Sequence, residues 1–239
     1  MHWLADSFER MTSIWRRAIH QYFNQVWYGR NHPLSLLLAP VGWVFAIIVW
    51  LRRVGYSTGL LRGMKIACPV IVVGNITVGG TGKTPIAAWL ARMLLEQGHK
   101  PGLVCRGYGG VAKEWPQQVR PDSDPIVVGE ESVLLARLSD CPVVAGPNRV
   151  DAAQALLDHT NCDIVISDDG LQHLRLARDL EIAVVDGVRR HGNGRCLPAG
   201  PLREPVSRLS SVDVIVANDG AKRGEFEIKM SPSRLRNLC

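Results

Sequence analysis

A short apolar run, a glycine-rich loop and a helix-like segment follow one another near residue 80. Residues 69–75 (PVIVVGN) are β-branched and apolar, which is typical of a buried parallel strand. The loop 76–84 (ITVGGTGKT) comes next, and 85–97 (PIAAWLARMLLEQ) has the composition of a helix that Gly98 ends. This order is the Walker A arrangement, which binds nucleotide phosphates, so the chain is expected to contain a P-loop domain.

The loop residues have distinct expected roles. Backbone N–H groups and the helix N-terminus cradle the phosphates, while Lys83 reaches the β- and γ-phosphates of ATP and the Thr84 hydroxyl binds Mg²⁺. Thr77 stands where the strict pattern has its first glycine. The residues expected to hold the nucleotide are Thr77, Val78, Gly79, Gly80, Thr81, Gly82, Lys83 and Thr84.

An acidic partner for the metal follows a second apolar run. Residues 162–169 (CDIVISDD) read as a strand that ends in Asp168 and Asp169. A strand-terminal Asp beside the phosphate loop is the Walker B geometry, so these carboxylates are expected to hold Mg²⁺ directly or through Thr84 and water. A turn or a helix cap is the alternative role for such a pair. The phosphate loop upstream favours the metal site.

The rest of the chain alternates between strand-like and helix-like runs. We expect strands over 102–105, 126–128, 142–145, 181–186 and 212–217, and helices over 131–138 and 149–159. This alternation predicts an α/β, P-loop NTPase-like fold with a mostly parallel sheet and helices on both faces. Ligands bind at the carboxyl ends of such strands, so four polar segments are expected to converge near the γ-phosphate. They are 106–110, 129–132, 168–173 and 186–187.

Basic residues are concentrated near the N-terminus. The formal net charge is +6, and residues 1–65 carry eight Lys and Arg against two acidic residues, so the rest of the chain is neutral. These bases surround apolar, Trp-rich sequence, which favours an anionic membrane surface over nucleic acid as a partner. Residues 1–33 are amphipathic and are expected to be an N-terminal extension.

One segment alone is long and apolar enough to meet a bilayer, which excludes a polytopic membrane protein. Residues 34–51 (LSLLLAPVGWVFAIIVWL) carry no charge, and Arg52 and Arg53 follow them. As a helix this segment is roughly 27 Å long, a marginal length for a hydrocarbon core of about 30 Å. We expect 34–53 to be a membrane-associating helix that is re-entrant or interfacial. A true span and a buried core helix are the alternatives.

Four motifs together resemble the tetraacyldisaccharide 4′-kinases of lipid A biosynthesis. They are GNITVGGTGKTP (74–85), CRGYGG (105–110), SDDGLQH (167–173) and GNGRCLPAGPLREP (192–205). The apolar segment ending in Arg-Arg also resembles that family's membrane-associating helix, and the similarity covers about 23–239. The resemblance implies an ATP- and Mg²⁺-dependent kinase on the cytoplasmic face of the bacterial inner membrane. It implies as substrate the 4′-hydroxyl of a membrane-held tetraacyldisaccharide 1-phosphate.

The resemblance also implies which side chains act. In the family the acid of a Gly-Asp-Glu-Pro stretch is catalytic, and here Glu130 stands at the Asp position, with Ser132 in place of Pro. Glu is one methylene longer, so its carboxylate must be held differently or activity is reduced. An ordinary acidic first turn of a helix is the alternative. The expected catalytic residues are Lys83, Glu130, Asp168 and Asp169, and Arg106, Glu131 and His173 are expected near the substrate or the phosphates.

The C-terminal region departs most from the family. Family members continue for about another domain and carry a Phe-Pro-Asp-His-His-type stretch whose His supports the catalytic acid, and this sequence has no such stretch. We therefore expect a P-loop kinase core over 66–218, the start of an incomplete second domain over 219–239, and weak or no kinase activity.

Two other functions fit parts of the sequence. A membrane-associated regulatory P-loop ATPase has a similar Gly-Gly-x-Gly-Lys-Thr loop, but with a Lys where this chain has Val78. A nucleotide-holding remnant without kinase activity is the second alternative. Lipid-independent ATP hydrolysis would indicate the first, and ATP binding without phosphoryl transfer the second.

Overall fold

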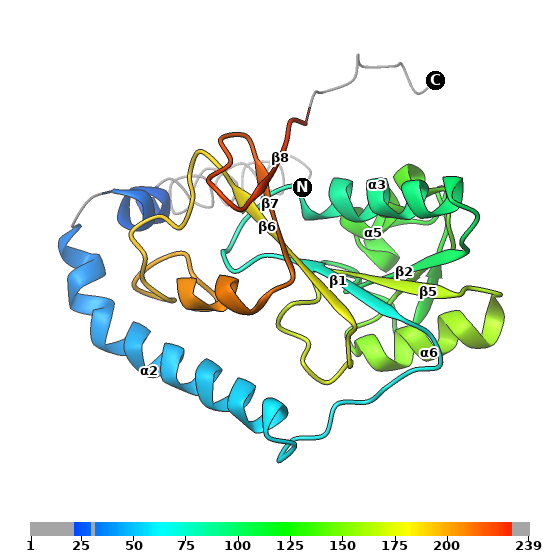
Figure 1. Cartoon of the computed structure of the whole chain (residues 1–239), viewed down its shortest axis with the longest axis horizontal. Coiled ribbons are helices and arrows are strands. Elements are labelled where there is room, and N and C mark those ends of the chain that lie inside the picture. Colours follow the sequence, from blue (N-terminus) through cyan, green and yellow to red (C-terminus); the bar gives the residue numbers. More distant parts are fainter. Residues whose placement is uncertain (1–21, 30–31, 231–239) are drawn as a thin grey trace, which may run out of the picture. The chain divides into compact units, whose positions relative to one another are not determined.

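The computed structural model describes residues 22–29 and 32–230 (Figure 1). The chain divides into two compact units. One combines the N-terminal residues up to Leu51 with Arg189–Val206, and the other holds Arg52–Val188 together with the residues from Ser207 onward. The second unit contains the sheet and all the residues expected to bind nucleotide, metal or acceptor.

An eight-stranded sheet forms the centre of this second unit. Its strand order is β3-β4-β2-β5-β1-β6-β7-β8, and only the β3–β4 pair is antiparallel. The strands are β1 (Val70–Gly74), β2 (Pro101–Cys105), β3 (Gln117–Val119), β4 (Val143–Ala145), β5 (Ile164–Asp168), β6 (Leu180–Asp186), β7 (Val214–Asn218) and β8 (Phe226–Ile228). The mostly parallel sheet predicted from the sequence is confirmed.

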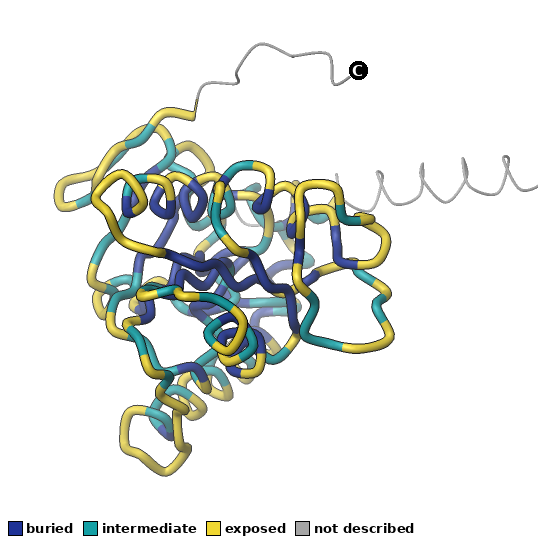
Figure 2. Tube along the Cα trace, turned by 90° about the vertical axis from the view of Figure 1, so that its right-hand side faces the viewer, coloured by how far each residue is buried: buried dark blue, intermediate teal, exposed yellow. Residues whose placement is uncertain are grey.

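Helices cover both faces of the sheet, as the near-continuous apolar strands require. The helices α3 (Lys83–Glu96) and α5 (Glu130–Ser139) bury Leu90, Leu94 and Leu135 on one face. The helix α6 (Arg149–His159) buries Val150 and Leu156 on the other. Figure 2 shows the strands as a buried band between more exposed covering segments. A six-residue 3-10 helix, η1 (Val206–Ser211), leads into β7.

One strand prediction was wrong and two strands were not predicted. Residues 126–128 lie in a single helical turn, α4 (Pro125–Val128), because the Asp124 side chain accepts a hydrogen bond from the Ile126 N–H at 2.8 Å and Pro125 takes the first helical position. The edge strands β3 and β8 have only three residues each, too few for a period-2 pattern. Because β8 pairs with β7, the sheet continues past the boundary expected at residue 219.

The apolar N-terminal segment forms one helix, α2 (Pro33–Ser57), with Pro40 inside it. It is the one helix among the described residues that is long and apolar enough to cross a membrane, by length and composition only, and 17% of its most apolar window is buried. Its exposed side chains include Leu37, Val44 and Ile48. A buried core helix, one of the alternatives above, does not describe this segment. The amphipathic extension predicted over 1–33 lies mostly outside the described residues.

The fourth sequence motif, residues 192–205, packs within the first unit. The Ser35 hydroxyl donates to the carbonyl of Ala199 at 2.6 Å, and the Asn193 amide donates to Ser35 Oγ at 2.8 Å. The Trp27 indole donates to the carbonyl of Pro198 at 3.1 Å. The motif therefore supplies hydrogen-bond partners for the first turn of α2, a role that its composition alone did not suggest.

Candidate functional site

The loop between β1 and α3 presents the start of a helix without a side-chain cap. Gly82 is the N-cap residue with φ 91°, a left-handed conformation that favours glycine, and no side chain there accepts a hydrogen bond from the first turn. The unpaired N–H groups and the helix dipole make this end of α3 attractive to anions. Lys83 is the first residue of α3 and adds a positive charge. The geometry predicted for a phosphate loop is therefore present.

Two polar contacts join this loop to the end of β5. The Thr84 hydroxyl donates to Asp168 Oδ2 at 2.8 Å, and Lys83 Nζ lies 3.7 Å from Asp169 Oδ1. The Walker A and Walker B segments predicted from the sequence thus meet side chain to side chain. Their strands are neighbours in the sheet, with Val73 in register with Asp168.

Asp168 lies in a site that disfavours its own negative charge. The residue is only 5% exposed, and burial raises the pKa of its carboxyl to about 6, with Asp169 and Glu131 raising it further and Thr84 and Lys83 opposing them. The second oxygen, Oδ1, is buried and accepts no hydrogen bond from any described residue. A buried carboxylate oxygen beside a threonine hydroxyl is a donor set that suits Mg²⁺.

Arg149 is a site residue that the sequence analysis missed. Its side chain is buried at the start of α6, where Nη1 donates to the carbonyl of Gly146 at 2.7 Å and Nη2 to the main-chain carbonyl of Asp168 at 3.3 Å. Burial lowers the pKa of the guanidinium, and Cys105, Asp169 and Asp168 oppose that shift. An arginine in the first turn of a predicted helix gave no signal, because sequence does not show which first-turn residues face the sheet.

Residues 129–132 lie beside residues 106–110, which follow β2. The segment 129–132 itself follows the helix α4 and not a strand. A Cβ on Gly129 would come within 2.4 Å of the Tyr108 carbonyl oxygen, so the two backbones are in close contact. The Cys105 thiol donates to the buried Ser132 hydroxyl at 3.1 Å, which attaches the start of α5 to the end of β2. Arg106 follows β2, with its guanidinium carbon 5.9 Å from the centre of the Tyr108 ring.

The two glutamates at the start of α5 are both exposed. Glu131 is near enough to Asp168 to raise the pKa of that carboxyl. Among the described residues no hydrogen bond or ion pair joins Glu130 to the phosphate loop, so its catalytic role stays a prediction.

His173 is held close to the arginines of this site. Burial lowers the pKa of its imidazole to about 4, and Arg149 and Arg106 lower it further, while Asp169 opposes them. The imidazole is therefore neutral at pH 7 and can exchange hydrogen bonds without adding positive charge. The neighbouring Gln172 amide donates to the carbonyl of Asn75 at 3.0 Å, which connects this segment to the phosphate loop.

Comparison with known proteins places the chain in one family. The family model for LpxK, described as tetraacyldisaccharide-1-P 4′-kinase, matches residues 34–237. The chain is 56% identical over 200 residues to a tetraacyldisaccharide 4′-kinase from Nitrosococcus oceani, covering 84% of this chain and 59% of the relative. It is 48% identical over 217 residues to one from Aeromonas salmonicida, covering 89% and 65%. The chain thus spans about three fifths of the length of these curated relatives.

A solved structure agrees with the sequence relatives. The chain is similar to LpxK from Aquifex aeolicus, crystallised in complex with ATP, with a TM-score of 0.72 and 30% sequence identity. The similarity covers 81% of this chain and 64% of that one. A P-loop kinase fold, the paired phosphate-loop and β5 side chains, and a family model over most of the sequence lead to one assignment. This chain belongs to the LpxK family, the tetraacyldisaccharide 4′-kinases.

Proposed function

We propose that this chain transfers the γ-phosphoryl group of ATP to the 4′-hydroxyl of a membrane-held tetraacyldisaccharide 1-phosphate. The observation that carries the proposal is the joining of Thr84 to Asp168 beside the Lys83–Asp169 ion pair, in a chain of this family. Phosphoryl transfer needs chiefly positioning and charge neutralisation, and these four side chains provide both at one edge of the sheet.

The phosphates of ATP bind along residues 77–84 in this proposal. The uncapped N-terminus of α3 supplies N–H donors, and Lys83 neutralises charge on the β- and γ-phosphates. When ATP binds, Lys83 exchanges part of its interaction with Asp169 for the phosphate oxygens. The nearby Asp169 carboxylate keeps the ammonium group directed at the loop.

Mg²⁺ fits the oxygen atoms between the loop and β5. Thr84 Oγ1 and the Asp168 carboxylate would hold the ion, with Asp169 beside them, and the buried Asp168 Oδ1 is an oxygen that still lacks a partner among the described residues. The ion supplies neutralisation of the charge that develops on the phosphate oxygens. Bound Mg²⁺ would also favour the ionised form of Asp168, because a nearby cation lowers the pKa of a carboxyl group.

The acceptor sugar approaches from the side of residues 106–110 and 129–132. Glu130 is proposed to accept the proton of the attacking hydroxyl, with Glu131 closer to the metal side because its charge acts on Asp168. Arg106 would bind phosphate oxygens, and neutral His173 would orient a hydroxyl or phosphate oxygen through a hydrogen bond.

The lipid substrate places this reaction at a membrane surface. The helix α2 exposes large apolar side chains along its length, as an interfacial or inserted helix requires. The basic residues counted near the N-terminus would bind anionic headgroups. We place the protein at the cytoplasmic face of the inner membrane, where ATP is available.

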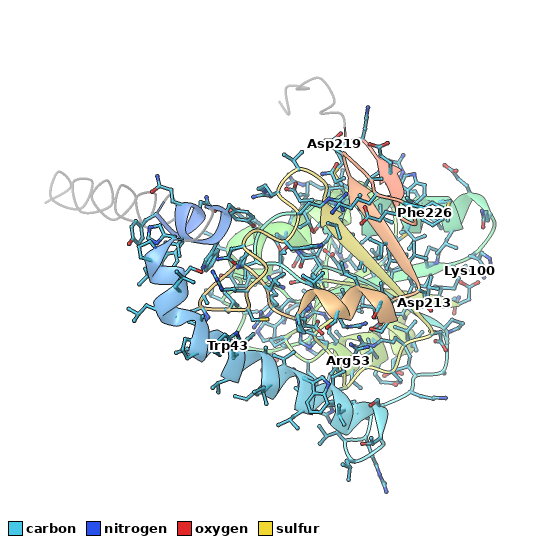
Figure 3. The ribbon with its side chains drawn as sticks, turned by 60° about the vertical axis from the view of Figure 1, so that its left-hand side comes forward. Trp43, Arg53, Lys100, Asp213, Asp219 and Phe226 are labelled. Carbon is cyan, nitrogen blue, oxygen red and sulfur yellow. The ribbon has the colours of Figure 1, made fainter. Side chains whose placement is uncertain are left out.

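A transfer assay tests the proposal. The 239-residue protein in detergent is incubated with Mg²⁺-ATP and a tetraacylated disaccharide 1-phosphate, and mass spectrometry detects one added phosphoryl group. Lys83→Ala is expected to lower the rate by at least about 100-fold, because one charge contact to the transferred group is lost. Lys100→Ala removes an exposed lysine outside the site and is the matched control, with an unchanged rate (Figure 3).

Each outcome of this assay has a definite meaning. Equal rates in wild type and Lys83→Ala contradict the phosphate-loop assignment. ATP hydrolysis that does not depend on lipid contradicts the proposed lipid acceptor and favours a regulatory ATPase. ATP binding with no transfer contradicts the kinase proposal for this chain and favours the nucleotide-holding alternative.

A further inference from the structure

On one side of the phosphate loop the strands extend further at their carboxyl ends than the strands on the other side. In β1, Val73 is in register with Asp168, the last residue of β5, and Gly74 is in register with Ala183 of β6. Beyond Ala183 the strand β6 continues to Asp186, which pairs with Asn218 at the end of β7. At about 3.3 Å per residue, β6 and β7 extend roughly 10 Å past the end of β1.

This asymmetry gives a bound nucleotide a direction. The contacts expected for the γ-phosphate and the metal lie toward β5, at Thr84 and Asp168. Since β5 and β6 flank β1 on opposite sides, a triphosphate whose last phosphate points toward β5 extends its nucleoside toward β6 and β7. The base therefore lies against the carboxyl ends of these two strands, which extend beyond the end of β1.

Asn218 presents a carboxamide at this place. Its Nδ2 lies 3.5 Å from the position that a Cβ on Gly82 would take, so the amide reaches the phosphate loop. Its Oδ1 is buried and accepts no hydrogen bond from the described part of the chain. The thioether of Met230 occupies the same space, with Sδ 2.9 Å from that Cβ position.

The backbone around Asn218 is held in place by its own hydrogen bonds. The Asn218 carbonyl accepts from the Gly187 N–H at 2.9 Å, and the Asp219 N–H donates to the Ile228 carbonyl at 3.0 Å. Figure 3 shows Asp219 at one end of β7 and Asp213 at the other, so Asn218 lies at the carboxyl end that the phosphate loop shares. The side-chain amide is thus positioned by a rigid main chain.

We infer that Asn218 recognises the adenine base of ATP, with the Met230 thioether packed against the face of the ring. A carboxamide matches one edge of adenine, because Oδ1 accepts from the N6 amino group while Nδ2 donates to N7. Guanine presents two acceptors on that edge, so the pairing selects adenine. The thioether makes a favourable sulfur–aromatic contact. This inference rests on the proposed use of ATP and adds the residue that selects the base.

Three ligands separate base recognition from phosphate binding. ATP, the triphosphate of purine riboside (which lacks the 6-amino group) and inorganic tripolyphosphate are titrated calorimetrically into the 239-residue protein in detergent without lipid. Asn218→Leu keeps the shape of the side chain and removes both polar atoms. It is expected to weaken ATP binding by about 10- to 100-fold, to abolish the preference for ATP over the purine riboside analogue, and to leave tripolyphosphate binding unchanged.

Two further variants complete the experiment. Asn218→Ala gives a second measurement if the leucine variant fails to fold, and Asn161→Ala, at an exposed asparagine outside the site, is expected to match wild type. ATP and tripolyphosphate binding that both stay at wild-type strength in the Asn218 variants contradicts the inference alone. If the Asn218 variants bind ATP and tripolyphosphate more weakly by the same factor, Asn218 has a structural role and the inference is overturned.

The same titrations distinguish this inference from the proposed function. A wild-type chain that binds neither ATP nor tripolyphosphate contradicts the nucleotide site and base recognition together. Base selectivity that depends on Asn218, in a protein that transfers no phosphate to lipid, contradicts the kinase proposal and supports the inference.

Discussion

Asp168, which is proposed to hold Mg²⁺, lies in a buried site where its ionised carboxylate lowers the free energy of unfolding. Its carboxyl is buried, donates nothing when ionised, and has one oxygen without a partner among the described residues. Burial raises the pKa to about 6. In the folded protein the group binds its proton at a higher pH than in the unfolded chain, so its contribution favours folding as pH falls from about 7 toward 4, and the ionised carboxylate costs stability above pH 6.

Replacing Asp168 with Asn is expected to stabilise the protein while removing activity. In EDTA at pH 7.5 the free energy of unfolding should rise by about 3 kcal/mol, because the buried carboxylate, whose pKa is raised from 3.8 to about 6, no longer opposes folding. The gain should disappear near pH 4, where the wild-type carboxyl is protonated. Urea unfolding at several pH values measures this difference.

The exposed residue Asp122 provides the matched control for that measurement. Asp122→Asn should change the free energy of unfolding by less than about 0.5 kcal/mol at every pH. A destabilised Asp168→Asn protein at pH 7.5 would show that the carboxylate has stabilising partners that outweigh its burial.

At the scale of elements, the predictable parts of this fold are those whose signal is local. The phosphate loop, the strand before it and the helix α6 follow from residue patterns in one window, and α6 has the predicted bounds. The turn at Pro125 was mistaken for a strand because three β-branched residues outweighed the Asp124 cap. The sequence could not predict that Arg149 lies against the end of β5 or that Asn218 lies beside the phosphate loop, since both positions depend on which strands are neighbours across the sheet.

The β6 and β7 ends illustrate such a non-local constraint. A Cβ on Gly187 would lie 1.2 Å from the Asp219 carbonyl oxygen, so the two strand ends touch through their backbones. Gly187→Ala is expected to lower the free energy of unfolding by about 3 kcal/mol, since main-chain atoms must move apart. Gly80→Ala is the control, because its Cβ meets nothing within 4 Å. Chemical denaturation of both variants tests this, and an unchanged midpoint for Gly187→Ala contradicts the close contact.

At the scale of the whole molecule, α2 is the element whose exposed surface is least typical of a water-soluble helix. Three of its apolar side chains, Leu37, Val44 and Ile48, are each more than half exposed. A membrane-associating helix was the sequence-based expectation for this segment, and membrane binding remains a proposal that vesicles can test directly.

Binding to vesicles is expected to depend on these three side chains. Substituting Leu37, Val44 and Ile48 by Gln should weaken partitioning onto anionic phospholipid vesicles by at least about tenfold, because large apolar groups no longer enter the interface. The control makes the same change at three apolar residues outside the helix that are at least as exposed, Leu60, Val111 and Val188. Sedimentation with vesicles measures both proteins, and equal binding of the two triple variants contradicts a role for α2.

The hydrogen bond between Ser35 and Ala199 spans 164 positions of the chain. During translation at about 5 to 20 residues per second, roughly 10 to 30 seconds separate the synthesis of the first partner from that of the second. Throughout this interval α2 is made but its partner segment is not. We expect a nascent chain to meet the bilayer through α2 before residues 192–205 exist, so that the order of synthesis favours docking first and closure of the first unit afterwards.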